Sequence, residues 1–411
     1  MATHSAIEPP ATIGILGGGQ LGRMLGGAAR AMGYRLVVLD PDIECPAAAV
    51  ADRVIPAAYD DIGGALRLAD ACDVVTYELE HVAAGVVAAI EPLVPVRPGL
   101  HPLLVTQDRL AERRFVEGAG VAVAPWREVE SVPSARSAAD ELGLPFRLKL
   151  PIGGYDGRGQ LRITSVEQLD DAWSRLDRAP GWPLLAEREL DFDAELSIVV
   201  ARALDGSTAA YPLSRNRHDD GILVESVAPA PVGDRIADAA RVIGLRLAEA
   251  MELCGTLTAE LFLLRDGSLA VNELAPRVHN SGHWTIEGAA TSQFEQHVRA
   301  ICGLPLGSTA ALSPTAMVNL LGTGPARRAQ LLGAEAALAD PAVHLHLYDK
   351  RRVFERRKMG HLTALGPDVE TALEAARRAG SALRWADDEA PASPTPPSAA
   401  VGATATTESE P

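Results

Sequence analysis

The sequence of 411 residues has little cysteine and a shortage of positive charge. Its four cysteines are scattered, with no CxxC pair and no metal-ligand spacing, which argues against a disulfide scaffold and a structural zinc site. Only 38 Lys and Arg stand against 54 Asp and Glu, so the formal charge is −16. Because nucleic-acid binding needs a basic surface, we expect no nucleic-acid partner, although a local basic pocket stays compatible with this balance.

Long apolar runs are also missing. No stretch of eighteen apolar residues is available for a transmembrane helix, so we expect no membrane partner. Residues 1–14 lack a basic region followed by an apolar core, which argues against a signal peptide. Apolar residues still make up 47% of the chain and charged residues 22%, which is typical of globular proteins. We therefore expect a cytoplasmic protein of about two to three domains.

Changes of pattern along the chain predict an α/β organisation. Residues 1–11 and residues 386–411 are rich in small and polar residues or proline, and we expect both ends to be disordered. Residues 12–106 alternate short apolar strands with helical stretches, which is typical of a doubly wound parallel sheet. Residues 107–196 indicate a linker helix and strands around a glycine loop. Residues 197–385 carry longer alternating strands, which predict a mixed or antiparallel sheet.

The first glycine loop, Gly17-x-Gly19-x-x-Gly22, follows a predicted strand and opens a predicted helix, and Asp40 ends the next strand. This arrangement matches the dinucleotide-binding fingerprint. Many α/β domains need the same glycines simply to turn from strand to helix. Since nothing downstream resembles hydride-transfer machinery, we favour the structural interpretation and keep an NAD(P)-dependent oxidoreductase as an alternative.

The second glycine loop, GGYDGRGQ at residues 153–160, follows a predicted strand that ends with Lys149. Bare glycine N–H groups can lie against phosphate oxygens, and the lysine supplies a positive charge near them. The alternative is a long hairpin loop with an ordinary surface lysine. The density of glycine favours a phosphate-binding loop.

A predicted hairpin at residues 257–274 places two carboxylates opposite each other. Its strands flank Asp266-Gly267, a preferred two-residue loop. The resulting cross-strand pairs are Leu264–Leu269, Phe262–Val271 and Glu260–Glu273. Like charges in such a pair destabilise a sheet, so the two glutamates, with Asn272 beside them, indicate a divalent cation, most simply Mg²⁺. The alternatives are that both acids point into solvent, or that a one-residue bulge breaks the register.

Two further segments carry polar chemistry. APRVHNSGHWTIE at residues 275–287 could be imagined to hold a Ser–His nucleophile, but no GxSxG elbow supports it, so we favour a substrate-binding loop. RRVFERRKMGH at residues 351–361 contains six basic residues in an acidic chain. Such a run is usually a solvated strand face, and here it equally indicates a confined pocket for a substrate phosphate.

The chain resembles the N5-carboxyaminoimidazole ribonucleotide synthases, purine-biosynthetic members of the ATP-grasp superfamily, over residues 13–385. The strings that carry the resemblance are GGGQLGRM, QDR, GGYDGRGQ, HDDGIL, NELAPRVHNSGHWTIE, SQFEQH and KRRVFERRKMGH. It implies an α/β fold of ATP-grasp architecture: an N-terminal doubly wound, Rossmann-like pre-ATP-grasp domain, a small lid and a C-terminal mixed-sheet domain. It also implies a homodimer. The chain departs from the family pattern at Arg113, Arg114, Val278 and Trp284.

The resemblance also implies roles for individual residues. The implied ATP-binding residues are Arg109, Lys149, Gly154, Tyr155, Asp156, Gly157, Arg158, Gly159, Gln160, Glu187, Arg188, Glu189, Leu190, Glu195, His218, Asn272 and Glu273. Among them, residues 187–190 should line the adenine and Glu195 should take the ribose hydroxyls. The implied substrate-binding residues are Gln20, Leu21, Glu78, Tyr155, Asp156, Arg277, His279, Asn280, Ser281, Lys350 and Arg357. The implied catalytic residues are Lys149, Asp156, Arg277 and His279, and the implied magnesium ligands are Glu260 and Glu273.

The implied reaction is an ATP-dependent carboxylation. Bicarbonate attacks the γ-phosphate of MgATP, and the resulting carboxyphosphate delivers CO2 to the exocyclic amine of 5-aminoimidazole ribonucleotide. The products are N5-carboxyaminoimidazole ribonucleotide, ADP and phosphate. His279, or Asp156 beside Tyr155, would take the amine proton, and the sequence leaves both open. The alternatives are a formate-dependent glycinamide ribonucleotide transformylase, an NAD(P)-dependent oxidoreductase, and an inactive nucleotide sensor.

Overall fold

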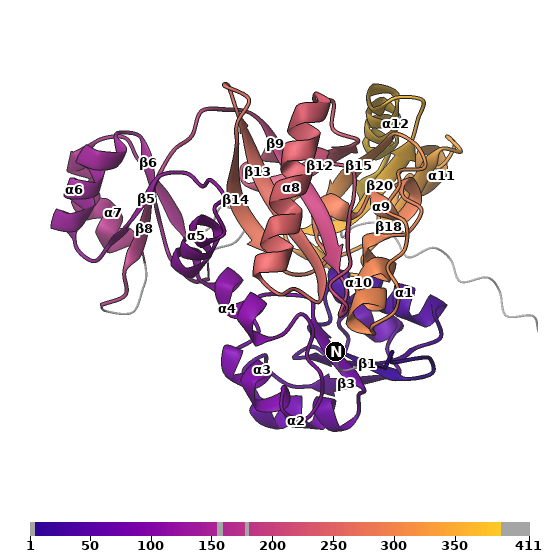
Figure 1. The fold of residues 1–411 in the computed structure, drawn as a ribbon. Coiled ribbons are helices and arrows are strands. Elements are labelled where there is room, and N and C mark those ends of the chain that lie inside the picture. The colour runs from indigo at the N-terminus through magenta and orange to yellow at the C-terminus, as the bar shows by residue number, and fades with distance from the viewer. Residues whose placement is uncertain (1–4, 154–158, 177–180, 388–411) are drawn as a thin grey trace, which may run out of the picture.

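A parallel four-stranded sheet with helices on both faces forms the N-terminal part of the computed structural model (Figure 1). The structure describes residues 5–153, 159–176 and 181–387. The strands are continuous apolar runs because the sheet is buried on both faces. In spatial order they are β3 (Arg53–Pro56), β2 (Arg35–Asp40), β1 (Thr12–Leu16) and β4 (Val74–Tyr77). The helices of this part are α1 (Gln20–Ala31), η1 (Pro46–Ala49), α2 (Ile62–Asp70), α3 (Ala84–Ile90) and α4 (Leu100–Gln107).

One helix on this sheet comes from far along the chain. Helices α2 and α3 pack on one face, whereas α1 shares the other face with α10 (Gln293–Ile301). Phe294 and Ile301 of α10 lie in one apolar core with Leu25 of α1 and Val38 of β2. Helix α10 is therefore anchored on the N-terminal sheet.

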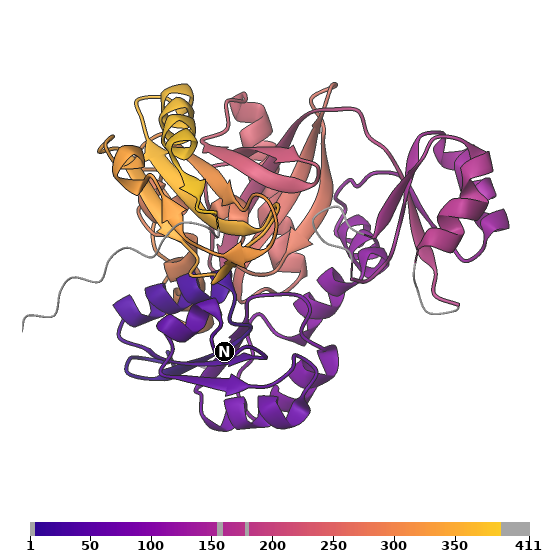
Figure 2. The same ribbon diagram turned by 180° about the vertical axis from the view of Figure 1, so that it is seen from behind.

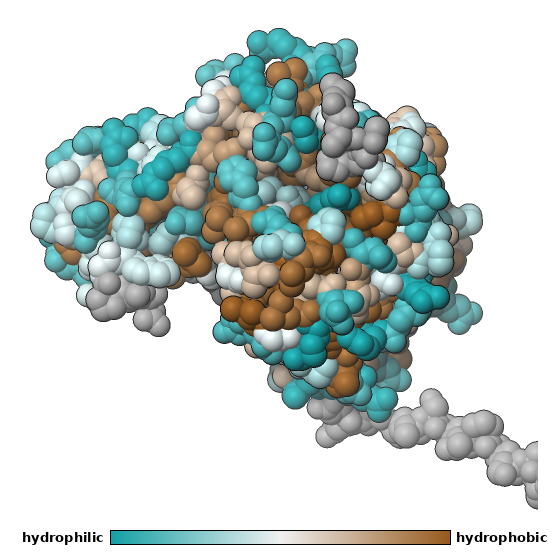
Figure 3. All heavy atoms as spheres, turned by 60° about the horizontal axis from the view of Figure 1, so that its bottom comes forward, coloured by the Kyte–Doolittle hydropathy of each residue, from teal (hydrophilic) through white to brown (hydrophobic). Residues whose placement is uncertain are grey.

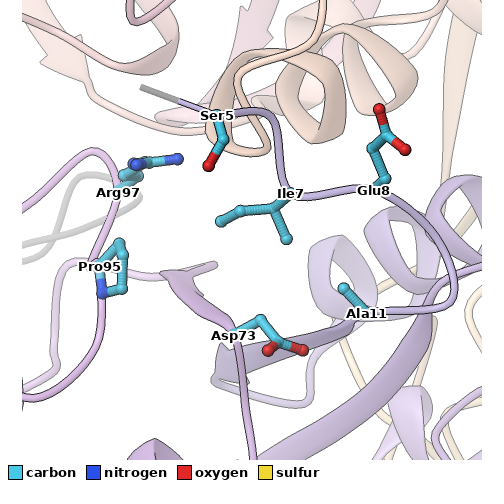
Figure 4. A pocket seen from close by; sticks show the side chains of 7 residues that line it. All are labelled: Ser5, Ile7, Glu8, Ala11, Asp73, Pro95 and Arg97. Carbon is cyan, nitrogen blue, oxygen red and sulfur yellow. The ribbon is translucent and has the colours of Figure 1, made fainter. Parts of the chain in front are cut away.

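The N-terminal residues 5–11, which we expected to be disordered, lie against the body of the molecule. The N–H of Ile7 donates to the carbonyl of Cys302 at 2.8 Å, and the carbonyl of Ile7 accepts from the hydroxyl of Tyr34 at 2.7 Å. Ile7 also packs on the core beneath α1 and α10. The prediction was wrong because it weighed composition and proline, whereas a few backbone bonds and one isoleucine anchor the segment. An open groove separates this segment from neighbouring residues, lined by Ser5, Ile7, Glu8, Ala11, Asp73, Pro95 and Arg97 (Figure 4).

The predicted disordered tail lies outside the described residues from position 388 onward. Its first residue, Ala386, is instead buried and paired: its N–H donates to Gln330 at 2.9 Å and its carbonyl accepts from Arg327 at 2.7 Å. The folded body therefore extends at least one residue past the expected boundary.

A small four-stranded antiparallel sheet with helices packed on it projects to one side of the molecule (Figures 1 and 2). The second glycine loop joins its adjacent strands β6 and β7, in which Lys149 pairs with Gln160. In spatial order the strands are β5 (Trp126–Val129), β8 (Leu184–Arg188), β6 (Phe146–Lys149) and β7 (Gln160–Ile163). The helices are α5 (Arg109–Gly118), which leads in, and α6 (Val132–Leu142), η2 (Val166–Gln168) and α7 (Leu169–Arg175).

A nine-stranded sheet forms the rest of the body, and every pairing between its named strands is antiparallel. Of the two arrangements that the sequence left open, the antiparallel one is therefore observed. In spatial order its strands are β14 (Leu269–Ala275), β13 (Gly255–Leu264), β9 (Phe192–Arg202), β11 (Ser214–Asp219), β12 (Ile222–Ala228), β15 (Thr315–Leu321), β20 (Lys358–Leu365) and β18 (Val343–Leu347), with β10 (Thr208–Ala210) beside β9.

Further helices and two short strand pairs complete this part. Within the described ranges, no helix is long and apolar enough to cross a membrane. The helices here are α8 (Asp234–Ala250), η3 (Asn280–Gly282), α9 (Thr285–Gly288), α11 (Ala334–Ala337) and α12 (Val369–Ala382). The short strand pairs are β16 (Arg327–Arg328) with β19 (Arg352–Val353) and β17 (Leu331–Leu332) with β21 (Arg384–Trp385).

The β13–β14 hairpin departs from its predicted register at two places. Its loop has three residues, not two, because the N–H of Leu264 donates to Ser268 at 2.9 Å and Gly267 takes a positive φ of 80°. The outer pairs are therefore Leu263–Leu269, Phe262–Ala270 and Leu261–Val271. The register then shifts by one residue at Asn272, as in a bulge. The two deviations cancel, so Glu260 does pair with Glu273 as predicted.

Candidate active site

A cleft of about 1270 Å³ lies where the N-terminal part, the small sheet and the nine-stranded sheet meet. It gathers most of the described residues that the sequence singled out: Gln20, Leu21, Glu78, Arg109, Lys149, Gln160, Glu187, Arg188, Glu189, Leu190, Glu195, His218, Glu260, Asn272, Glu273, Arg277, His279, Asn280 and Lys350. Three described residues are not in its lining: Gly159, Ser281 and Arg357. Gly154, Tyr155, Asp156, Gly157 and Arg158 lie outside the described residues.

The first glycine loop binds carboxylates of its own chain. Glu78 accepts from the N–H groups of Gly19 and Gly22, both at 2.8 Å, and Asp40 accepts from the N–H of Gly18 at 2.7 Å. A Cβ on Gly19 would lie 2.6 Å from Glu78, so glycine is needed for this approach. Burial raises the pKa of Glu78, although the two N–H donors oppose it. The N-terminus of α1, where a pyrophosphate would bind, is thus occupied, which argues against the dinucleotide interpretation.

A buried ion-pair chain lines the side of the cleft next to the small sheet. Nζ of Lys149 lies 2.5 Å from Oε2 of Glu187, and Nε of Arg113 lies 2.6 Å from Oε1 of the same carboxylate. Burial would raise the pKa of Glu187, but Lys149 and Arg113 together lower it to about 2. Burial lowers the pKa of Lys149, although the charge of Glu187 acts in the opposite direction. Glu187 therefore holds the lysine at the mouth of the second glycine loop.

Two residues of α5 that the sequence did not assign to the site complete this chain. Arg113 also donates to Glu112 at 2.6 Å and to the carbonyl of Asn272 at 2.7 Å. Glu112 accepts from the N–H of Leu274 at 2.8 Å, and burial raises its pKa to about 7. The string AERR gave only a weak clue, because adjacent charges on a helix are usually exposed. The other basic departure, Arg114, pairs with Glu128 at the surface.

The nine-stranded sheet adds a polar pair and an apolar wall. Glu195 on β9 lies 2.8 Å from Nδ1 of His218 on β11, and this bond raises the pKa of His218 against the effect of burial. Phe192 stacks on Phe262 with ring centroids 4.5 Å apart. The apolar residues of the cleft lining include Phe192, Phe262 and Leu274 of this sheet, as well as Ala124 and Leu190.

The opposed glutamates fit a bound cation. Burial and the charge of Glu273 raise the pKa of Glu260 to about 7. The nearest histidine, His279, has Nε2 3.8 Å from Oε1 of Glu260, but burial and Arg277 lower its pKa well below the usual value, so it is neutral. In the described ranges no group of three or more His, Cys, Asp or Glu side chains is placed to hold a metal ion. A cation between the glutamates would therefore draw further ligands from a phosphate or water, as Mg²⁺ does.

The opposite side of the cleft carries the charged residues of the 275–287 segment and of residue 350. Arg277 pairs with Glu80 at 2.7 Å, and its buried Nε has no partner among the described residues. Nδ1 of His279 lies 2.9 Å from the hydroxyl of Ser281, a residue outside the cleft lining, and this contact fixes the orientation of the imidazole. Nζ of Lys350 donates to Gln20 at 2.7 Å, which joins this side to α1. Glu80 was missed, although it stands two residues after Glu78 in YELE.

Arg357 lies away from the cleft lining. Its guanidinium lies 5.0 Å from the centroid of the Phe354 ring and donates to the carbonyl of Arg352 at 2.6 Å. Burial and Arg352 lower its pKa. The neighbouring Lys358 lines the cleft instead.

The two apolar departures from the family pattern serve packing. Val278 and Trp284 are fully buried in separate apolar clusters and neither lines the cleft. These substitutions therefore leave the charged groups of the site in place.

Comparison with known proteins agrees with this arrangement. Residues 10–107 match the ribonucleotide synthetase preATP-grasp domain, residues 114–294 the ATP-grasp domain, and residues 315–375 the phosphoribosylaminoimidazole carboxylase C-terminal domain. The chain is 41% identical over 365 residues to an N5-carboxyaminoimidazole ribonucleotide synthase of Brucella melitensis, which covers 88% of this chain and 98% of the relative.

Solved structures are similar over almost the whole chain. The N5-carboxyaminoimidazole ribonucleotide synthetase of Thermotoga maritima has a TM-score of 0.83 and 37% identity, covering 92% of this chain and 100% of that one. The synthase of Aspergillus clavatus in complex with ADP and 5-aminoimidazole ribonucleotide has a TM-score of 0.81 and 29% identity, covering 90% and 98%. The fold, the contents of the cleft and these similarities lead to one conclusion: the chain belongs to the N5-carboxyaminoimidazole ribonucleotide synthase family of ATP-grasp ligases.

Proposed function

We propose that this chain carboxylates 5-aminoimidazole ribonucleotide with bicarbonate and ATP, giving N5-carboxyaminoimidazole ribonucleotide, ADP and phosphate. The proposal is supported by the presence of cationic, acidic and imidazole side chains in one cleft. Lys149, Arg277 and His279 line this cleft together with the Glu260–Glu273 pair, and the His279 imidazole lies 3.8 Å from Glu260. A phosphoryl transfer coupled to a second substrate needs these groups side by side.

The nucleotide half would lie against the small sheet. The apolar wall near Leu190 offers a surface for adenine, and Glu195 offers a carboxylate to the ribose hydroxyls. Lys149, already inside the cleft, would shift from Glu187 toward the phosphates. Positioned positive charge is the main requirement for phosphoryl transfer, because negative charge spreads over the transferring oxygens. The residues of the glycine loop from 154 to 158 would add N–H donors in the same proposal.

Mg²⁺ is the cation we propose for the glutamate pair. Glu260 and Glu273 would hold it, with Asn272 alongside. When bound, Mg²⁺ neutralises charge on the phosphates. Its presence would also relieve the repulsion that raises the pKa of Glu260.

The carboxylation half would lie against Arg277, His279 and Lys350. An oxygen of bicarbonate attacks the γ-phosphorus, and the bond to the bridging oxygen of ADP breaks. The resulting carboxyphosphate yields CO2 and phosphate, and the amine nitrogen of the ribonucleotide bonds to the carbon of CO2. In this proposal the neutral His279 accepts the proton that the amine loses, while Asp156 remains the other candidate. Lys350 would bind the ribonucleotide phosphate.

We further propose a cytoplasmic homodimer, as the family resemblance implies. A band of apolar residues crosses the face of the molecule shown in Figure 3, which is the kind of surface that oligomers cover. Sedimentation of the purified chain would measure its mass directly.

Release of ADP with different substrate pairs tests the reaction. With MgATP and bicarbonate alone we expect slow hydrolysis, and a sharp increase when 5-aminoimidazole ribonucleotide is added. The same protein should not respond to formate with glycinamide ribonucleotide. If only the formate pair stimulates ADP release, the transformylase alternative replaces this proposal.

A further inference from the structure

Gln293, the first residue of α10, lies outside the cleft lining yet holds the main chain of a residue that lines it. Its side chain is completely buried. Oε1 accepts from the N–H of His279 at 3.0 Å, and Nε2 donates to the carbonyl of His279 at 2.7 Å. The amide therefore pairs with both backbone groups of His279, as a neighbouring strand would.

The same amide and its backbone tie down the residues that follow. Because Oε1 takes the N–H of His279, Nε2 is a donor, and it lies 3.3 Å from Nδ1 of His283. The backbone N–H of Gln293 donates to the hydroxyl of Thr285 at 2.9 Å, and this hydroxyl donates to the carbonyl of Gly282 at 2.6 Å. One residue of α10 thus fixes three points of the 275–287 segment.

Gly282 explains why the amide fits here. A Cβ on Gly282 would lie 2.5 Å from Oε1 and 2.7 Å from Cδ of Gln293. The glycine of HNSGH and the glutamine of SQFEQH are therefore complementary, since only a residue without a side chain leaves room for the amide. Neither residue contacts the cleft itself.

We infer that Gln293 is a positioning residue for the carboxylation: it fixes the main chain of His279. It thereby sets the place of the His279 imidazole beside Glu260 and of the Arg277 guanidinium, which donates to the carbonyl of Val278 next to His279. This inference rests on the proposed function. Because α10 packs on the N-terminal sheet through Phe294, the amide also sets this half of the site relative to the part that carries Gln20 and Glu78. Misplacement of about 1 Å can cost about a hundredfold in rate, so two lost bonds at this point should matter.

The chain offers a matched control on the same helix. Gln296 is also fully buried and binds both backbone groups of one residue: its Oε1 accepts from the N–H of Gly307 at 2.7 Å, and its Nε2 donates to the carbonyl of Gly307 at 2.9 Å. Neither Gln296 nor Gly307 lines the cleft. The two glutamines therefore share burial and bonding but differ in what they hold.

The experiment compares Gln293→Met with Gln296→Met in the full chain. We expect similar losses of melting temperature, because each variant leaves buried backbone groups unpaired. Only Gln293→Met should lower kcat of ribonucleotide-dependent ADP release, by about ten- to a hundredfold, while the Kd of ADP stays within about twofold. Equal kcat values in the two variants would show that Gln293 only stabilises the fold, and would overturn its positioning role. If the unmodified chain shows no ribonucleotide-dependent ADP release, the proposed function itself fails, which is a different result from equal kcat values in the two variants.

A second variant, Gln293→Glu, distinguishes the effect of the two hydrogen bonds to His279 from the effect of side-chain packing. A protonated carboxylic acid keeps one donor and one acceptor, and burial favours that neutral form. His279 and His283, which face the amide, are held neutral by burial. Relative to the unmodified chain at each pH, Gln293→Glu should keep most of its activity at low pH and lose it as pH rises. Gln293→Met should show a flat ratio. A flat and equally low ratio for both variants would overturn the pairing role.

Discussion

Arg113 lies completely inside the molecule and still keeps its charge. Its guanidinium donates to two carboxylates and one carbonyl, so each of its three nitrogens has a partner. The pairing matters for the site because Glu187, shared with Lys149, would otherwise be a buried carboxylate with only one cation. The residue thus connects α5, β8 and β14 at the side of the cleft next to the small sheet.

Removing that guanidinium should be costly. Arg113→Met leaves Glu112 and Glu187 buried with less compensation, and breaking a buried pair in this way costs about 3–5 kcal/mol. Urea unfolding should show this loss, whereas Arg114→Met, at the exposed neighbour, should cost less than about 1 kcal/mol. A loss below 1 kcal/mol for Arg113→Met would mean that the ion-pair chain does not stabilise the fold.

The glutamate pair gives a prediction with the opposite sign for stability. Glu273→Gln removes one of two like charges, so the pKa of Glu260 should fall from its raised value and the melting temperature should stay the same or rise. Turnover at limiting Mg²⁺ should fall heavily, because a carboxylate ligand is lost. Glu249→Gln on the exposed part of α8 is the control for a general charge effect. Unchanged turnover of Glu273→Gln at limiting Mg²⁺ would contradict the cation site.

Sequence motifs located the charged residues of the cleft better than their partners. Lys149 and Glu187 were expected from their strings, and the structure brings them together. Glu112 and Glu80 could not be found in this way, because their partners stand far away in the chain and only the fold reveals them. A charged residue next to a motif looks the same in sequence whether it is buried or solvated.

At the scale of elements, the β13–β14 hairpin shows how a correct pair can come from an incorrect register. A glycine with positive φ serves a two-residue and a three-residue loop alike, so Asp266-Gly267 could not distinguish them. The bulge at Asn272 is held from outside the hairpin, since Arg113 binds its carbonyl and Ala122 accepts from the N–H of Val271. The sequence of the hairpin alone does not predict these contacts.

Glu225 ties three elements together and predicts a pH dependence of stability. On β12, it pairs with Arg217 of β11 and Arg377 of α12. Burial would raise its pKa, but the two arginines lower it to about 2, against 4.5 for the free side chain. The depressed pKa means that its stabilisation is present above about pH 4.5 and is lost as the pH falls toward 2.

Glu225→Gln should therefore unfold more easily than the unmodified chain at pH 7. Both arginines are half exposed, so solvent screening limits the difference to about 1 kcal/mol. Urea unfolding at several pH values should show the difference shrinking below about pH 4.5. A difference that grows on acidification would have the wrong sign for this ion pair.

At the scale of the whole molecule, the cleft exists only because three parts of the chain meet. Family strings predicted this architecture, and the alternating strands of residues 12–106 predicted the parallel sheet. What the sequence could not supply is the distance between parts. The bond between Lys350 and Gln20 joins two residues of the cleft lining that stand 330 positions apart in the chain.

Lys350 should affect one substrate and spare the other. Charge-assisted hydrogen bonds are worth about 1.5–3 kcal/mol, so Lys350→Ala should raise the KM of the aminoimidazole ribonucleotide about ten- to a hundredfold. The KM of ATP should stay nearly constant. Arg351→Ala, next to it but paired with Glu44 at the surface, should leave both constants unchanged. An equal rise in the KM of ATP would place Lys350 in the nucleotide half or in the structure of the cleft.

The source of the phosphate oxygen tests the central claim most directly. If bicarbonate attacks ATP in this cleft, one oxygen of ¹⁸O-labelled bicarbonate must leave with the phosphate. Mass spectrometry of the phosphate, in the presence of 5-aminoimidazole ribonucleotide and soon after mixing, should show one ¹⁸O per phosphate formed, with none in ADP. Phosphate without ¹⁸O, whose fourth oxygen comes from water, would show that ATP is hydrolysed directly, and it would contradict the proposed carboxylation through carboxyphosphate.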